Sequence, residues 1–173
     1  MRAMVLSENW DEILDGHSLP VYDRPREQAW RHWVMGLAQA SKGNVVAANI
    51  EARQMDAALK QYEEVVKRKA PAELLVAREE LAGHIQAAEG KVIKGLKTLE
   101  SASKMQRKLR YSEPAYYPRP VAEALGEVAL RNGKRSIAET AFRTCLDDLP
   151  GSVRSVNGLK EAQKPRNKQV GVD

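Results

Sequence analysis

Few side chains of this chain are able to do chemistry, and their spacing matches no catalytic motif. Three histidines, His17, His32 and His84, lie far apart in the sequence, and none belongs to a His-Glu-x-x-His motif. Cys145 lies at a small-residue position of a helical repeat, where a buried, unreactive thiol is more typical than a nucleophile. The glycines lack the Lys-Ser or Lys-Thr pair of a phosphate-binding loop. We therefore expect no enzyme activity, no metal ion and no cofactor.

Acidic residues offer a candidate binding surface. Glu80 and His84 are four residues apart and therefore share one face of a helix. In the repeat alignment described below, Glu123 and Glu127 occupy the equivalent face of a later helix. We call these four residues the acidic strip, and we expect that they could hold a basic peptide on a concave surface. Metal binding is a weaker alternative, and the simplest interpretation is a solvated helix face with no ligand. A site for a C-terminal carboxylate would instead need Lys and Asn at these positions, so we do not expect that ligand.

Aromatic residues form a second candidate contact surface. Trp33 occupies the position in the first repeat that Glu80 occupies in the second, and Trp30 lies three residues earlier. These rings either pack in the core against the N-terminal helix or form an aromatic platform for a ligand. Tyr116 and Tyr117 belong to the connector YYPRP, where the alternatives are packing over the helix ends and contact with a ligand.

Basic residues gather in one segment of the chain. Residues 91–110 contain seven cations and a single acid, and so more than account for the formal net charge of +5. Five lysines in this segment form a basic stripe at helical spacing, Lys91, Lys94, Lys97, Lys104 and Lys108. A stripe of this kind binds phosphate backbones in some proteins. It has no interleaved aromatic residues, however, and a solvated helix face is the simpler interpretation.

Length and composition indicate the class of protein that positions these residues. The chain has 173 residues, of which 43% are hydrophobic, 29% charged and only 5% aromatic. This composition is typical of one globular domain and argues against a β-sandwich or barrel. No uncharged run reaches the ~18 residues of a membrane span. The acidic N-terminal segment and the single cysteine do not indicate secretion. We expect a soluble, cytoplasmic protein with no membrane partner.

Apolar residues recur at helical spacing along most of the chain, and glycines or prolines interrupt the pattern at intervals. This pattern predicts eight helices. Their expected ranges are about 8–15, 26–42, 44–68, 71–89, 91–111, 118–132, 134–148 and 151–163. Residues 164–173 have little to bury, and we expect a disordered tail there.

Pairs of glycines seven residues apart reveal an internal repeat. The pairs are Gly36/Gly43, Gly83/Gly90 and Gly126/Gly133, and their starts are 47 and 43 residues apart. A period of this size is typical of stacked helical hairpins. The first glycine of each pair costs roughly 1 kcal/mol within a helix, so we expect a close helix crossing there. The second ends the helix and allows the chain to reverse.

The third repeat carries the most specific pattern. Leu125 and Gly126 are followed by Ala138 and Phe142, which are four residues apart, and then by Pro150. This order matches the tetratricopeptide pattern of Leu-Gly, Ala-x-x-x-Phe and a closing proline, with alanine in place of two aromatic residues. Phe142 is expected to fill the space that small neighbouring residues leave between the helices.

The chain resembles the C-terminal repeats of a bacterial tetratricopeptide-repeat protein family. The resemblance rests on four segments: NWDEIL (9–14), AWRHWVMGLAQASKG (29–43), ELAGHIQAAEG (80–90) and the stretch that begins with YSEPAYYP at residue 111 and ends at Pro150. It implies a binding scaffold and supplies no catalytic residues. In longer members of the family further repeats precede this part. We therefore expect the chain to start at the second helix of an incomplete hairpin. Either the chain is a fragment of a longer repeat protein, or a partner or, by self-association, a second copy covers this N-terminal edge.

Together these observations predict an all-α, right-handed solenoid of tetratricopeptide-like antiparallel helix hairpins with a C-terminal capping helix. The domain would cover residues 1–163, with units at about 26–68, 71–111 and 118–150 and a cap at 151–163. The expected function is a non-catalytic scaffold that binds a protein or peptide on its concave face. The alternative is binding of a nucleic acid or another polyanion through the basic helix 91–110.

Overall fold

The computed structural model describes residues 1–110, 112 and 115–164. All regular secondary structure in these residues is helical, which confirms the expected all-α class. The helices are α1 (Arg2–Leu6), α2 (Trp10–Ile13), α3 (Pro25–Ser41), α4 (Val45–Val66), α5 (Ala72–Ala88), α6 (Val92–Arg107), α7 (Val121–Arg131), α8 (Arg135–Asp148) and α9 (Val153–Gln163). The sequence pattern predicted α2 to α9 with ends that differ by up to four residues, and it missed the short α1.

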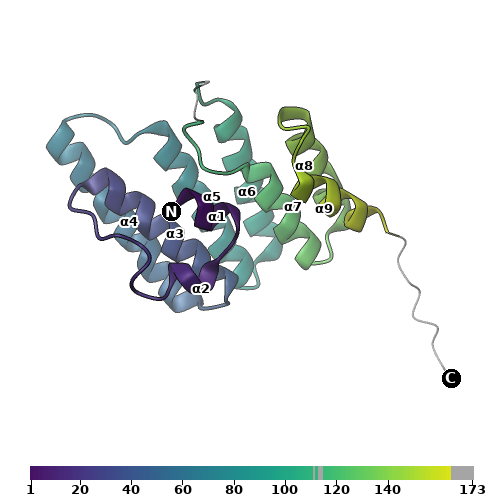
Figure 1. The fold of residues 1–173 in the computed structure, drawn as a ribbon, viewed down its shortest axis with the longest axis horizontal. Helices are drawn as coiled ribbons and strands as arrows, with labels where there is room; N and C mark the ends of the chain where they lie inside the picture. Colours follow the sequence, from purple (N-terminus) through teal and green to yellow (C-terminus); the bar gives the residue numbers. More distant parts are fainter. Residues whose placement is uncertain (111, 113–114, 165–173) are drawn as a thin grey trace. The chain divides into compact units, whose positions relative to one another are not determined.

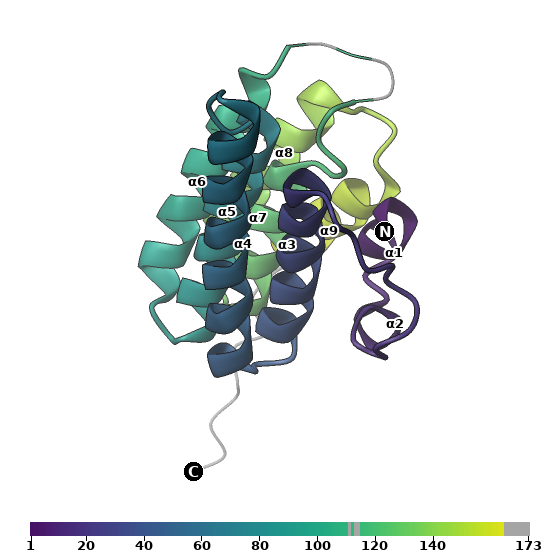
Figure 2. The same ribbon diagram turned by 90° about the vertical axis from the view of Figure 1, so that its left-hand side faces the viewer.

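The chain divides into two compact units, Met1–Val121 and Ala122–Asp173. In the N-terminal unit, α3 packs against α4 and α5 packs against α6, so each pair forms a helical hairpin. Helix α5 also contacts α3 and α4, which places the two hairpins side by side, with α2 against α3 (Figure 2). The core between the hairpins includes Leu37, Leu74 and Leu81, all buried.

The turn after the first helix of each hairpin has the same geometry in all three repeats. Gly43, Gly90 and Gly133 adopt φ of 76°, 81° and 68°, a left-handed conformation that glycine reaches without steric cost. In the first turn, the amide of Asn44 donates to the carbonyl of Gln39 at 2.9 Å, the six-to-one bond of a Schellman cap. The corresponding bonds after Gly90 and Gly133 are 2.9 and 2.8 Å. The second helix of each hairpin follows directly.

Close helix crossings occur at the first glycine of each pair. A Cβ atom added at Gly36 would lie 2.8 Å from Leu81 Cδ1, where α3 meets α5. One added at Gly83 would lie 2.7 Å from Leu99 Cγ, where α5 meets α6. Here α6 also supplies Gly95, whose added Cβ would lie 2.7 Å from the backbone oxygen of Gly83. The two helices are therefore close enough to exclude a side chain at this crossing.

In the C-terminal unit, α8 packs against α9 (Figure 1), and Phe142 of α8 is the largest buried side chain. Added Cβ atoms at Gly126 of α7 and Gly158 of α9 would both collide with the ring of Phe142. The Phe142 ring therefore occupies the space that these two glycines leave open. Pro150 lies in the exposed turn between α8 and α9, and Ser152 caps α9 by accepting a bond from the Ser155 amide at 3.1 Å.

Two further sequence predictions concern the C-terminal tail and the expected lack of a membrane-spanning helix. The expected disordered tail lies outside the described residues except for Lys164. Within the described residues, no helix combines the length and the apolar character that a membrane crossing requires.

Candidate functional site

The carboxylate of Glu80 is the centre of a buried polar cluster in the N-terminal unit. Its Oε1 accepts a hydrogen bond from Arg119 Nε at 2.9 Å and forms an ion pair with Nη2 of the same guanidinium at 2.8 Å. Its Oε2 accepts from the indole Nε1 of Trp33 at 3.1 Å and from the Tyr117 hydroxyl. Glu80 and Trp33 are both 0% exposed. The burial of this carboxylate is therefore compensated by one cation and two neutral donors.

His84 belongs to the same cluster. It is 7% exposed, and its Nε2 lies 3.0 Å from Arg119 Nη2. Because a guanidinium only donates, Nε2 of His84 accepts this bond and carries no proton. Arg119 also forms an ion pair with Glu8 at 3.5 Å, so it joins α5 to the segment between α1 and α2. Glu80 and His84 are thus paired within the chain, and their burial argues against direct contact with a ligand.

Arg119, the cation of this cluster, was not among the residues predicted from the sequence to form a site. It lies in the connector before α7 and is 6% exposed. A signal was present in the sequence, since a carboxylate on an otherwise apolar helix face needs a buried cation. The spacing of 39 residues between Glu80 and Arg119 gave no local reason to pair them.

Burial and charge together alter the acidity of Tyr117. Its pKa is raised well above the usual value of 10, first because the phenol is buried and second because the Glu80 carboxylate repels the phenolate. The hydroxyl therefore remains protonated and donates to Glu80. This bond fixes Tyr117 in the interior, in contrast to Tyr116 beside it, which is 54% exposed.

Three aromatic rings, those of Trp30, Trp33 and Tyr117, pack together beside the buried polar cluster. The ring centroids of Trp30 and Trp33 are 5.2 Å apart at an interplanar angle of 77°. Tyr117 lies 5.9 Å from Trp30 and 5.7 Å from Trp33. Edge-to-face contacts of this kind stabilise aromatic clusters. Trp33 and Tyr117 therefore pack in the core, whereas Trp30 and Tyr116 also reach the surface.

A pocket of ≈ 220 Å³ opens beside these rings in the N-terminal unit. Its lining is mostly apolar and combines α1, α3 and the connector before α7: Met1, Arg2, Trp30, Trp33, Tyr116 and Pro118. The sequence indicated the aromatic members but not Arg2, because the short helix α1 was not expected.

The other half of the acidic strip lies in the C-terminal unit and also has internal partners. Glu123 is 9% exposed and accepts hydrogen bonds from the hydroxyls of Ser152 and Ser155. Glu127 forms an ion pair with Arg154 Nη1 at 3.3 Å. The acidic residues of α7 thus contact the start of α9. Arg154 lies within ion-pair distance of both carboxylates and offsets part of their charge.

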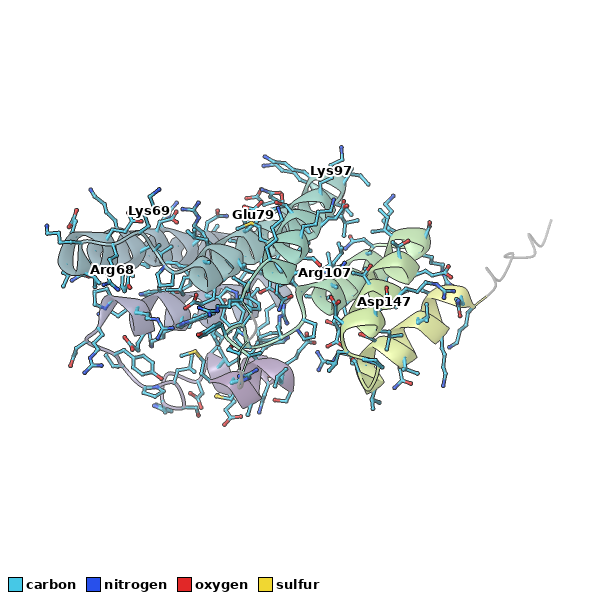
Figure 3. All side chains as sticks on the ribbon, turned by 90° about the horizontal axis from the view of Figure 1, so that it is seen from above. Arg68, Lys69, Glu79, Lys97, Arg107 and Asp147 are labelled. Atoms are coloured by element: carbon cyan, nitrogen blue, oxygen red, sulfur yellow. The ribbon has the colours of Figure 1, made fainter. Side chains whose placement is uncertain are left out.

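The basic stripe lies on the exposed surface of α6 and the residues that flank it. All five lysines are exposed, and the labelled Lys97 projects away from the ribbon (Figure 3). Lys91 pairs with Glu89 at 2.9 Å and Lys104 with Glu100 at 2.5 Å. In the part of the chain that the structure describes, Lys97 and Lys108 form no ion pair.

The remaining chemical candidates are separate from one another. His32 pairs with Glu51 at 2.7 Å between α3 and α4, and His17 lies in the exposed loop after α2. Cys145 is 1% exposed, and burial raises the pKa of its thiol. Among the described residues, no three His, Cys, Asp or Glu side chains come together as metal ligands would.

Comparison with known proteins leaves the geometry as the only guide to function. No protein-family model, curated protein or solved structure matches this chain.

Proposed function

We propose that this protein is a non-catalytic, tetratricopeptide-like scaffold that binds a peptide segment of another protein. In this proposal the hairpins stack as a right-handed solenoid, α9 is the capping helix, and the peptide lies on the concave face. The observation that carries the proposal is the threefold recurrence of one unit, a helix with an internal glycine at a close crossing, a Schellman turn, and a second helix. Repeated units of this kind form extended binding surfaces.

The burial of several site residues reduces the number of candidate residues that could contact a peptide. Glu80 and His84 stabilise the N-terminal unit from within and are not available to a peptide. Trp33 is also buried, but it contributes to the lining of the pocket beside Trp30. Trp30 and Tyr116 reach the surface and remain candidates for contact. Glu127 also remains a candidate because its side chain is 21% exposed. In this proposal the peptide therefore contacts the surface-accessible aromatic residues Trp30 and Tyr116 more than the acidic strip.

Selection from a display library of short random peptides tests this function. The full chain is immobilised through a C-terminal tag, and the tag alone is the control. We expect one recurring sequence motif that is absent from the control selection. Recovery of unrelated peptides only, in the same numbers as for the tag, would contradict peptide binding.

A second candidate function is polyanion binding by the basic stripe, favoured by the exposure of its lysines. Replacing Lys94, Lys97 and Lys108 by glutamine should lower the salt concentration that elutes the chain from immobilised heparin. Each lost phosphate contact should reduce the log–log salt slope by about 0.9 on duplex DNA. The matched control replaces Arg53, Arg68 and Lys69, which are exposed cations of α4 and the turn after it. Equal shifts for both variants would indicate net charge alone.

A further inference from the structure

The pocket beside Trp30 has the size of a single side chain. Sites that enclose a whole small molecule usually measure about 300–1,000 Å³. At ≈ 220 Å³ the pocket is smaller than this range, and it is open to solvent. Its volume and opening are therefore better matched to one side chain that projects from a bound segment than to a free cofactor.

The walls of the pocket select for an aromatic group. Trp30 and Tyr116 provide ring surfaces at the protein exterior, and Pro118 adds a further apolar wall. Aromatic rings prefer tilted or offset contacts with one another, and Trp30 already makes such contacts with its neighbours. Tyr116 is 54% exposed, so about half of its surface on the rim is open to solvent.

The floor of the pocket is held in place before any ligand binds. Trp33 is anchored by its bond to Glu80, and Tyr117 is anchored to the same carboxylate behind it. Arg119 completes this support from the connector. A preorganised floor reduces the entropy that binding would otherwise cost. The buried cluster thus acts as a positioning element for the aromatic pocket.

The charge at the pocket selects for a neighbouring carboxylate. Arg2 is exposed, and its guanidinium donates to the carbonyl oxygens of Ala115 and Tyr117 at 3.3 and 3.5 Å. A guanidinium has five N–H donors, so others remain for a ligand. Among the residues that the structure describes, the lining contains no acidic side chain, which disfavours a cationic guest such as a quaternary ammonium group.

We infer that this pocket binds one aromatic side chain of a peptide segment, with an adjacent Asp or Glu of the same segment paired with Arg2. This inference rests on the proposed peptide-binding function and names its principal anchor. In the proposed complex the aromatic ring of the peptide lies between Trp30 and Tyr116, and the carboxylate of the peptide contacts the Arg2 guanidinium at the rim.

The test begins with the peptides recovered from the random display library. We expect an aromatic residue directly beside Asp or Glu to recur among them. The strongest peptide is then labelled with fluorescein, and its affinity for the full chain is measured by polarisation. Tyr116→Ala and Arg2→Gln should each weaken binding about tenfold, whereas Tyr116→Phe should retain it. The matched controls, Tyr62→Ala and Arg53→Gln on α4, should leave the affinity unchanged. Circular dichroism establishes that each variant is folded.

Every other outcome overturns the inference in a distinguishable way. Peptides that bind the Tyr116 and Arg2 variants as tightly as the parent chain would exclude this pocket and leave peptide binding intact. Loss of binding on Tyr116→Ala but not on Arg2→Gln would exclude the acidic neighbour. Recovery of no peptide would remove both this inference and the proposed function. Self-association that Tyr116→Ala abolishes in sedimentation would identify a second copy of the chain as the occupant instead.

Discussion

Arg119 donates from Nε to one oxygen of Glu80 and holds Nη2 2.8 Å from the same oxygen, and the pair lies in the interior of the N-terminal unit. The bond links α5 to the connector that precedes α7. The same connector carries Tyr117, which is buried and donates to this carboxylate, and Tyr116, which is 54% exposed. A buried charge with this many partners stabilises one arrangement of the connector over others.

Removal of the cation from this pair should strongly destabilise the N-terminal unit. Arg119→Met leaves the Glu80 carboxylate buried with neutral donors only, and we expect a loss of about 3–5 kcal/mol in the free energy of unfolding. Urea denaturation measures this change. Glu80→Met combined with Arg119→Met should be less destabilising than the sum of the single variants, because neither charge is then left alone.

A surface pair provides the control for this experiment. Arg143 and Glu139 lie one turn apart on α8 and are joined at 2.8 Å, with the Arg143 side chain 58% exposed. Arg143→Met should change stability far less than Arg119→Met, because water already solvates both charges. Equal effects of the two substitutions would show that burial of the Glu80 pair carries no special cost.

The raised pKa of Tyr117 predicts a loss of stability at alkaline pH. The buried phenol stays protonated in the folded chain, whereas in the unfolded chain it ionises near pH 10. Its contribution to stability is therefore complete below pH 10 and declines as the pH rises from there through the raised native value. Unfolding free energies measured on both sides of pH 10 should show this decline, and Tyr117→Phe should reduce it. An equally steep decline in the variant would assign the effect to other groups.

The close packing of Phe142 against Gly126 and Gly158 predicts that adding a methyl group at either glycine lowers the stability of the C-terminal unit. A Cβ at Gly126 would lie 2.6 Å from Phe142 Cε1, and the ring also packs directly against the backbone of Gly158. Gly126→Ala should therefore cost about 1–3 kcal/mol, as overpacking does. Thermal unfolding gives the change, and Phe142→Leu in the same chain should recover part of it.

The exposed Gly151 is the matched control for this substitution. A Cβ at this position has no heavy atom within 4 Å, and its φ is not in the left-handed region. Gly151→Ala should leave the melting temperature nearly unchanged. If Gly126→Ala behaves like Gly151→Ala, then α7 and α8 do not cross at Phe142 as described.

Burial of Cys145 predicts a thiol that reacts slowly. Only the thiolate attacks disulfide reagents, and burial both raises the pKa of this thiol and blocks access to it. Labelling with a chromogenic aromatic disulfide should be slow in the native chain and fast in denaturant. An exposed thiol placed by Asn157→Cys in a Cys145→Ala chain is the control and should react at once. Rapid native labelling of Cys145 would indicate frequent opening between α8 and α9.

Local features of the fold were predictable because they depend on residues close in sequence. The Schellman turns at Gly43, Gly90 and Gly133 follow from the need for a left-handed residue after each helix. The expected close crossing at Gly126 follows from the cost of glycine within a helix. The short helix α1 escaped prediction because its five residues are too few to show a helical period.

The distribution of the candidate site residues between surface and interior was not predictable in the same way. Helical spacing correctly placed Glu80 and His84 on one face of α5 but did not reveal which segment covers that face. The cover comes from Arg119 and Tyr117 in the connector, and this turns a candidate ligand surface into a buried cluster. The same connector places Tyr116 beside Trp30 and Arg2 to form the pocket.

The amino-acid sequence by itself therefore determined the helices, their turns and the small residues at their crossings, because these depend on backbone conformation and steric fit over short distances. Only the tertiary structure decided that Glu80 is neutralised in the interior while Trp30, Tyr116 and Arg2 line an open pocket. The physical reason is that a buried charge is stable only beside its counter-charge, and here the counter-charge lies 39 residues away along the chain.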